Sequence, residues 1–483
     1  MYYLTHHLWP HVVALTIVAV ALTAAGHVVL YKRDLRSAVG WIGLIGLLPF
    51  FGAILYALFG VNRIQRRAAT MRRHQPELPA SPEPLTCDTA ELEKNLSADA
   101  RHLSMLARGV GDIGDIPLLR GNTVTPLQNG DEAYPEMLAA IETACSSITF
   151  SSYIFAHDKT GLAFADALVA ASHRGVEVRV LVDYVGMRYS FPSIVHRLHH
   201  GGVKAAEFMP TFVPWRTPYM NLRNHRKILV VDGKLGFTGG INIRIDNLHR
   251  EHPSEPVRDL HFKMTGPVVG QLQEIFAEDW AFTTHEILDG GKWFPKLEAT
   301  GPVIARGIPD GPDEDLDKLR KVIMMALACS QKSVRIVTPY FLPDLSLIAA
   351  MNTTVMRGVS VEIVIPERPN LRAVGWAATG QLWQILEHGC RLWLAQEPFD
   401  HTKLMIVDDV WSLIGSANWD PRSLRLNFEF DVECYDADLA TRLNELFVLK
   451  REHAREATIA EVDARPLPIR LRDGVARLFS PYL

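Results

Sequence analysis

The chain has 483 residues, a length that predicts two or three domains, and a formal net charge of −4 with a pI near 6.6. This balance excludes a strongly basic protein that would attract nucleic acid over its whole surface. The five cysteines are scattered, odd in number and without a Cys-x-x-Cys pair, which argues against a disulfide framework and against a structural zinc site.

Two apolar stretches open the chain and predict an N-terminal transmembrane hairpin over residues 1–61. The first runs from Leu8 to about Tyr31, and the second runs from Ala38 to Gly60 with Pro49 near its middle, where proline kinks a helix. A cleaved signal peptide is the alternative for the first stretch. No lysine or arginine precedes that stretch and a second one follows closely, so the hairpin is the favoured interpretation.

Residues 62–117 are predicted to join the hairpin to a globular region. A proline-rich linker over Gln75–Asp88 is followed by a helical connector over Ala90–Arg108. More basic residues follow the second apolar stretch than lie in the loop before it, and this bias predicts a cytoplasmic globular region. The basic residues that follow are Arg63, Arg66, Arg67, Arg72 and Arg73.

From residue 118 onward the chain repeats itself. The segment Ile148–Phe155 corresponds to Val334–Phe341, and further matching segments follow in the same order in both halves. Each half alternates short β-branched runs with helical segments, which predicts layered α/β sheets in a duplicated domain, at 118–300 and 301–483. Helices are expected at Ala163–His173, Gln271–Trp280 and Asp317–Cys329.

One motif, His-x-Lys-x4-Asp, occurs once in each half. Its apolar x4 runs, Ile228–Val231 and Leu404–Val407, predict buried strands. Residues two apart on a strand face the same side, so each histidine projects beside its lysine. Such a pair supplies an imidazole that can attack or carry a proton, next to a fixed cation. The two copies are His225, Lys227 and Asp232, then His401, Lys403 and Asp408.

The motif aspartates occupy a different kind of position. Asp232 ends its apolar run and precedes Gly233, and Asp408 precedes Asp409, in both cases a sequence typical of turns. The sequence therefore favours a turn or structural acceptor for both aspartates over contact with a substrate.

The doubled motif resembles the phospholipase D superfamily, in which two such half-sites meet across a pseudo-two-fold axis. This resemblance implies two α/β/α sandwich domains and a catalytic set of His225, Lys227, Asp232, His401, Lys403 and Asp408. One histidine becomes a covalent phosphohistidine and the other protonates the leaving alcohol, without a metal or other cofactor. His225 is the preferred nucleophile and His401 the preferred acid and base, and the reverse assignment stays open.

The resemblance also implies supporting groups at four positions. Asn242 and Asn418, each in the turn after its motif, bind phosphate oxygens together with the lysines. The carboxylates Asp259 and Glu429 hydrogen-bond the histidines. Phosphodiester cleavage requires these parts, because it needs a nucleophile, a general acid and positive charge on the non-bridging oxygens.

Further segments narrow the resemblance to bacterial cardiolipin synthases over nearly the whole chain. Small departures occur at Asn370, Thr402 and Trp419. Thr402 and Trp419 flank the second half-site, so they concern the choice of acceptor more than the chemistry. The matching segments are Pro49–Gly52, Asn221–Lys227, Gly266–Val269 with Asp279-Trp280, Thr338–Phe341, Arg422-Ser423 and Asn427–Glu429.

The resemblance implies an enzyme of the bacterial inner membrane that transfers a phosphatidyl group between two phosphatidylglycerol molecules, giving cardiolipin and glycerol. No nucleic-acid partner is expected, and the sequence indicates no oligomeric state. The alternatives are a phospholipase D that releases phosphatidic acid, a nuclease of the same superfamily and an inactive membrane scaffold. Packing in the core or in a loop is the default interpretation of Phe212, Trp215 and Tyr219, and an aromatic lip at the mouth of the site is expected almost equally.

Overall fold

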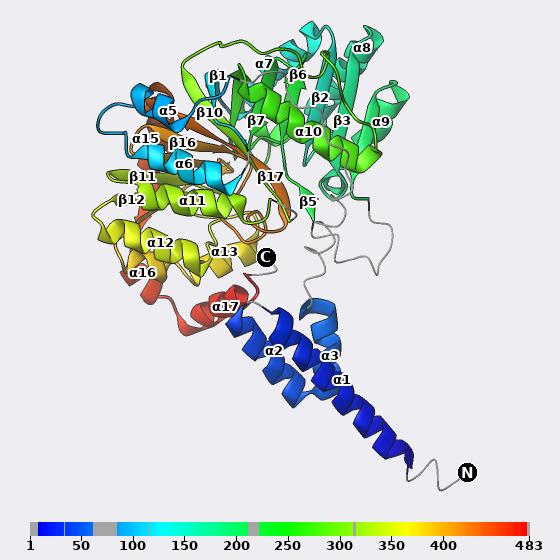
Figure 1. Ribbon diagram of the computed structural model, residues 1–483, viewed down its shortest axis with the longest axis vertical. Coiled ribbons are helices and arrows are strands. Elements are labelled where there is room, and N and C mark those ends of the chain that lie inside the picture. Colours follow the sequence, from blue (N-terminus) through cyan, green and yellow to red (C-terminus); the bar gives the residue numbers. More distant parts are fainter. Residues whose placement is uncertain are drawn as a thin grey trace. The chain divides into compact units, whose positions relative to one another are not determined.

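The computed structural model describes residues 8–32, 34–60, 85–114, 116–210, 222–312 and 315–480. It divides the chain into two units, Met1–Thr70 and Met71–Leu483 (Figure 1). The arginines at 63–73, most of the proline-rich linker and the three aromatic residues expected at a lip lie outside the described residues.

The N-terminal unit begins with α1 (Trp9–Tyr31), whose length and apolar composition suffice to cross a bilayer. The second apolar stretch is divided into α2 (Leu35–Leu47) and α3 (Pro49–Leu55), followed by a π-helical turn, η2 (Tyr56–Gly60). The break falls at Pro49 because proline has no backbone N–H to continue the ladder of α2. Among the described residues, α1 is therefore the one helix long enough to span a membrane.

Among the described residues, one mixed sheet of 16 strands forms the centre of the second unit, with fifteen strands in one path and the sixteenth, β5 (Arg223–Asn224), paired with β17 (Asn427–Tyr435). Its halves join where β1 pairs antiparallel with β10. The first half runs outward from β1 (Leu119–Gln128) through β9 (Leu260–Thr265), β7 (Leu235–Gly239), β6 (Ile228–Val231), β2 (Ser147–Ser152), β3 (Glu177–Asp183) and β4 (Lys204–Phe208). The second half runs through β10 (Val303–Asp310), β17 (Asn427–Tyr435), β16 (Trp411–Gly415), β15 (Leu404–Val407), β11 (Ser333–Val337), β12 (Ser360–Pro366), β13 (Arg391–Ala395) and β18 (Ala454–Ala457).

The two halves repeat one topology. In each, three strands run parallel (β2, β3 and β4, then β11, β12 and β13), and a hairpin carrying the motif pairs antiparallel with the first of them. The x4 runs form β6 and β15 with the predicted bounds. This repetition confirms the duplicated α/β architecture.

Both faces of the sheet are covered by helices, because the strand residues are apolar on both sides (Figure 1). Along β6, Leu229 and Val231 face the core under α7, α8 and α9, while Ile228 and Val230 face the core under α10. That second core continues into the other half beneath α15. The helices are α7 (Asn129–Thr143), α8 (Lys159–His173), α9 (Ile194–His200), α10 (Val268–Thr284) and α15 (Ala437–Glu452).

The expected helical connector is two helices, α5 (Thr89–Asn95) and α6 (Leu103–Ile113). Although they precede the first half in the chain, their apolar side chains, Leu92 and Leu106 among them, join the core of the second half. The other helices of that half are α11 (Lys318–Cys329), α12 (Leu345–Met356), α13 (Arg372–Thr379), α14 (Trp383–Leu386), α16 (Ile459–Asp463) and α17 (Leu467–Leu478).

Candidate active site

Each motif histidine follows a two-residue strand that pairs in parallel with a strand from the opposite half of the chain. The backbone N–H of His225 extends one pairing by donating to the Phe428 carbonyl at 2.9 Å. The N–H of His401 extends the other by donating to the Arg258 carbonyl at 2.7 Å. The pairings are β5 (Arg223–Asn224) with Asn427-Phe428 of β17, and β14 (Phe399–Asp400) with β8 (Val257–Arg258).

Because of these pairings, each motif histidine contacts a carboxylate that belongs to the other half of the chain. Nδ1 of His225 lies 2.9 Å from a carboxylate oxygen of Glu429, which belongs to the second half. Nδ1 of His401 lies 2.7 Å from a carboxylate oxygen of Asp259, which belongs to the first half. An imidazole that donates its Nδ1–H to a carboxylate presents the lone pair of Nε2 to a reactant. Each histidine is thus oriented by the half of the chain to which it does not belong.

The carboxylate of Glu429 is itself fixed by the second half. It accepts hydrogen bonds from the Ser416 hydroxyl at 2.6 Å and the Asn427 amide at 2.9 Å. Burial opposes its ionisation, but the charge and hydrogen bond of His225 prevail and hold the pKa of Glu429 below its usual value. Glu429 therefore stays anionic, and so it can stabilise a positive charge on His225.

Both motif lysines are buried beside their histidines. Lys227 Nζ donates to the His225 carbonyl at 2.7 Å, and Lys403 Nζ lies 2.9 Å from His401 Nδ1. Burial lowers the pKa of Lys227 to about 7 and that of Lys403 to about 8. Burial also lowers the pKa of His225, and it lowers the pKa of His401 to about 4. Near neutral pH the substrate-free site combines uncharged imidazoles with a cationic Lys403 and a half-ionised Lys227, a combination suited to an anionic phosphodiester.

These pKa values predict a bell-shaped pH profile for kcat/KM, which reports the free enzyme. A lysine is charged below its pKa, so the rate should begin to fall near pH 7 as Lys227 loses its proton, and fall further above about pH 8 as Lys403 does. It should also fall on the acid side, below the usual histidine pKa, once the attacking imidazole is protonated. Lys227→Arg should move the alkaline limb upward if the variant binds substrate. An alkaline limb at pH 10 or above in the wild type would contradict this prediction.

The two motif asparagines follow strands β7 and β16. Asn242 Oδ1 accepts the backbone N–H of Ile154 at 3.1 Å, which leaves its Nδ2 group to donate to a ligand. Asn418 is buried, and its Nδ2 donates to the Ser423 hydroxyl at 3.1 Å. Within the described residues its Oδ1 has no hydrogen-bond partner. An amide oxygen accepts and cannot bind an ionised phosphate oxygen, so Asn418 would contact phosphate through the second hydrogen of its Nδ2 group.

The motif aspartates lie at the other end of the strands from the histidines. Asp232 accepts the backbone N–H groups of Cys145, Ser146 and Ser147, at 2.6–3.1 Å. Asp408 accepts those of Gln331, Lys332 and Ser333 and also contacts His102 Nε2 at 2.7 Å. Seven residues of extended chain separate each aspartate from its histidine by roughly 20 Å. Both aspartates stabilise turns by accepting backbone hydrogen bonds, and both lie away from the histidine side chains.

Asp408→Ala is expected to lower stability and leave catalysis nearly intact. The change leaves three backbone N–H donors and His102 without their acceptor, and this should lower the free energy of unfolding by about 2–4 kcal/mol. The thermal midpoint should fall, while kcat of the folded enzyme stays within tenfold. Asp409→Ala is the matched control, since the Asp409 side chain is half-exposed at the same turn. A catalytic role for Asp408 would instead lower kcat without changing the midpoint.

Two tyrosines, which the sequence analysis did not assign to the site, line it symmetrically. The Tyr153 ring lies 5.0 Å from the His225 ring, and the Tyr340 ring lies 6.2 Å from the His401 ring. Lys227 Nζ also lies 5.4 Å from the centre of the Tyr153 ring. A partial signal was present in the sequence, because both tyrosines lie in the matching segments Ile148–Phe155 and Val334–Phe341, although Tyr153 is the sixth residue of its segment and Tyr340 the seventh.

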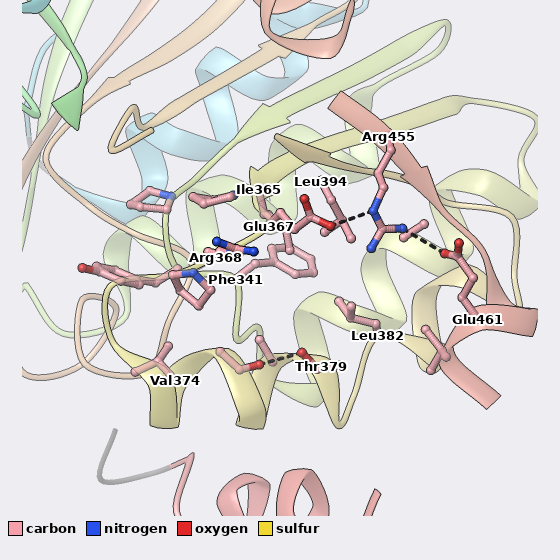
Figure 2. A pocket seen from close by; sticks show the side chains of 18 of the residues that line it. Phe341, Ile365, Glu367, Arg368, Val374, Thr379, Leu382, Leu394, Arg455 and Glu461 are labelled. Atoms are coloured by element: carbon pink, nitrogen blue, oxygen red, sulfur yellow. Dashed lines mark hydrogen bonds and ion pairs between the residues drawn. The ribbon is translucent and has the colours of Figure 1, made fainter. Parts of the chain in front are cut away.

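A cavity of about 490 Å³ opens beside the second half-site (Figure 2). Tyr340 and the chain that follows β12 form part of its wall, and α13 forms another part. Its lining is mostly apolar, and Figure 2 shows Arg455 held between Glu367 and Glu461 at its edge. Its volume lies in the range typical of small-molecule sites.

Comparison with known families gives two matches. The family described as "Cardiolipin synthase, PLD-like domain" matches residues 137–280 and 323–450, one match in each half of the sheet. The family described as "Phospholipase_D-nuclease N-terminal" matches residues 19–60, in the N-terminal unit.

Individual relatives match nearly the whole chain. Cardiolipin synthase A of Pseudomonas putida is 33% identical over 463 residues, covering 96% of this chain and 96% of the relative. Cardiolipin synthase of Alkalihalophilus pseudofirmus is 31% identical, covering 94% and 90%. Among solved structures, phosphatidylserine synthase of Haemophilus influenzae aligns with a TM-score of 0.61 at 17% identity, over 78% of this chain and 100% of that one. The structural likeness supports the fold alone.

Proposed function

The chain belongs to the cardiolipin synthase family of the phospholipase D superfamily, and we propose that it transfers a phosphatidyl group from one phosphatidylglycerol to another. The products are cardiolipin and glycerol. The observation that carries this proposal is the pair of buried histidines, each oriented by a carboxylate of the opposite half and flanked by a lysine. The half-sites lie in repeats that we assign to residues 118–300 and 301–483.

In the first step, Nε2 of His225 attacks the phosphorus of the donor lipid. The bond from phosphorus to the glycerol oxygen breaks, and His401, which must carry a proton on Nε2 once the anionic lipid is bound, gives that proton to the oxygen. Glycerol leaves, and the phosphatidyl group stays on His225. Glu429 stabilises the positive charge that His225 acquires. Lys227, Lys403 and the amides of Asn242 and Asn418 hold the non-bridging oxygens.

In the second step, the glycerol headgroup of another phosphatidylglycerol enters. His401 takes the proton of its primary hydroxyl, the oxygen attacks phosphorus, and the bond to Nε2 of His225 breaks. The enzyme returns to its starting state, and the sequence of steps is reversible. Water in place of the lipid alcohol would release phosphatidic acid, so the choice between transfer and hydrolysis depends on how the acceptor is held.

A lipid substrate requires contact with a bilayer, and α17 supports such contact. Its apolar side chains at spacings of four, four and three residues are exposed: Leu467 (67%), Leu471 (60%), Val475 (54%) and Leu478 (73%). The opposite side of the helix is anchored, with Asp473 buried between Arg465 and Arg472 and Ala476 packed at α13. On a helix of 3.6 residues per turn, Arg470 and Arg472 flank the apolar stripe, as in helices that lie in the interface of anionic bilayers.

We expect Leu471→Asn with Val475→Asn to weaken activity on phosphatidylglycerol vesicles several-fold, by raising KM. The loss should shrink when the lipid is dispersed in detergent, because bilayer contact is then not needed. Met356→Asn, which alters a still more exposed apolar residue (79%) at the end of α12, is the control. Equal losses in vesicles and detergent would contradict the assignment of α17 to the membrane surface.

Two finer features of membrane attachment belong to the same proposal. The N-terminal unit is proposed to enter the inner membrane as a hairpin of α1 and the segment α2–α3, although α2 alone, at about 20 Å, is too short to span the bilayer. The catalytic unit is proposed to lie on the cytoplasmic side, following the arginines that succeed the hairpin in sequence.

The function is tested with the full-length protein in vesicles of phosphatidylglycerol labelled in its glycerol headgroup. Transfer predicts that one free glycerol appears for each cardiolipin formed. A phospholipase D would release one glycerol for each phosphatidic acid, without cardiolipin. Release of neither product would contradict both activities.

A further inference from the structure

The cavity beside His401 breaks the symmetry between the two half-sites. In the first half, the turn after β3 packs against Tyr153 so closely that a Cβ on Gly186 would lie 1.8 Å from the Tyr153 carbonyl oxygen. In the second half, the equivalent turn after β12, at Glu367–Pro369, lines the cavity together with Tyr340. The tyrosine that contacts His401 is thus also a wall of the cavity.

The position of the cavity relative to the sheet suits a ligand. The parallel strands β11 and β12 both end there, since Pro339–Phe341 follow β11 and Pro366 closes β12. Ligands of layered α/β proteins bind beyond the carboxyl ends of parallel strands, where the connecting segments diverge. β15 runs antiparallel to β11, so His401, which precedes β15, lies at this same edge.

The described lining combines an apolar interior with three arginines, of which Arg455 and Arg465 are held in short ion pairs and Arg368 is not. Val374 of α13 faces Ile365 and Leu394 of the sheet across the cavity, and Ala378 of the same helix also lines it. Arg455 is neutralised by Glu367 at 2.7 Å and by Glu461 at 3.2 Å. The Arg368 side chain is 80% exposed, and its contact with Glu397, at 3.4 Å, is long. Such a lining fits a molecule with an apolar body and an anionic group.

The order of the chemical steps indicates whether a lipid in this cavity would be the donor or the acceptor. In a double displacement the entering alcohol takes the place that the leaving alcohol has vacated, because the second step retraces the first. Both alcohols therefore lie on the side of the histidine that handles their proton, which is His401 in the proposed mechanism. The cavity adjoins that side through Tyr340.

We propose that this cavity holds the acceptor lipid, with acyl and glycerol-backbone atoms of the second phosphatidylglycerol among Ile365, Val374 and Leu394. Arg368 faces the phosphate of that lipid. The proposal rests on the proposed function and on the role of His401 as acid and base. Anchoring the remote part of the acceptor holds its hydroxyl at the phosphohistidine, and this favours transfer over attack by water.

The test separates the acceptor from the donor by using two alcohols with the full-length protein in vesicles. Cardiolipin formation requires a lipid acceptor, whereas exchange of free labelled glycerol into phosphatidylglycerol requires only the donor lipid and a small alcohol. Val374→Phe fills the cavity, and Arg368→Gln removes its cation from an exposed position where folding is not at risk. The controls are Ala373→Phe and Arg372→Gln, exposed positions of the same helix that do not line the cavity.

We expect both cavity variants to lower the ratio of cardiolipin formation to glycerol exchange at least tenfold, and to raise the share of phosphatidic acid. The controls should keep the wild-type ratio. Equal loss of both reactions would assign the cavity to the donor, and unchanged ratios would show that it takes no part, so either result overturns the proposal. Glycerol exchange without cardiolipin in the wild type would instead contradict the proposed function itself.

Discussion

Replacing His225 by alanine is expected to abolish phosphatidyl transfer, lowering the rate by about 10⁴-fold or more, because no covalent intermediate can form. The pocket around position 225 should stay folded, since the Arg226 guanidinium remains bound to Asp279 at 2.7 Å and the backbone pairing with β17 remains. The measurement is the initial rate of cardiolipin formation in phosphatidylglycerol vesicles, with acid-labile label retained on the protein as the readout of the intermediate.

His401→Ala provides the contrast that distinguishes the two histidines. Loss of a general acid costs about 10²–10⁴-fold with the glycerol headgroup, whose oxygen needs a proton to leave. A donor lipid with a nitrophenol headgroup needs no such proton, so His401→Ala should still release nitrophenol in a burst and retain the phosphatidyl group. His225→Ala should give no burst. The opposite pattern would make His401 the nucleophile.

The second large effect is expected when the carboxylates that contact a histidine of the other half, Glu429 and Asp259, are replaced. Glu429→Gln should lower kcat by about 10²–10⁴-fold, because an amide can neither fix the Nδ1–H tautomer nor stabilise the imidazolium. Asp259→Asn should act in the same way on His401. The variants should bind substrate almost normally, so the loss should appear in kcat more than in KM.

Double variants test whether each carboxylate acts on the histidine of the other half. Glu429→Gln should add little to His225→Ala, since both disable the same unit, although the two residues lie 204 positions apart in the chain. Glu429→Gln combined with His401→Ala disables both units and should cost more than either change alone. If Glu429→Gln were instead redundant with His401→Ala, the carboxylate would serve its own half.

The elements that the sequence predicted best are those determined by local pattern. The runs of β6 and β15 have their predicted bounds because four consecutive apolar, largely β-branched residues fit a strand buried on both faces. Helix α11 begins within one residue of its predicted start, whereas α10 is longer than predicted at both ends. The repeat itself identified both half-sites, since its segments keep their order.

Features that depend on contacts distant in sequence were not predictable. Nothing near His225 indicates that its carboxylate partner comes from the other half, because the two-residue pairing of β5 with β17 has no pattern of its own. The packing of α6 onto the second half also depends on residues that are distant in sequence. The cavity beside Tyr340 exists because the turn after β12 is shaped differently from the turn after β3. The similar sequences of the two halves do not indicate this difference.

The most direct test of the composite site is lipid analysis of a host that lacks cardiolipin, expressing the wild type, His225→Ala, Glu429→Gln or Asp409→Ala. With all four proteins present in the membrane in equal amounts, cardiolipin should appear with the wild type and Asp409→Ala. It should be absent with His225→Ala and strongly reduced with Glu429→Gln. Wild-type levels of cardiolipin in the His225→Ala strain, or none in the wild-type strain, would contradict the account.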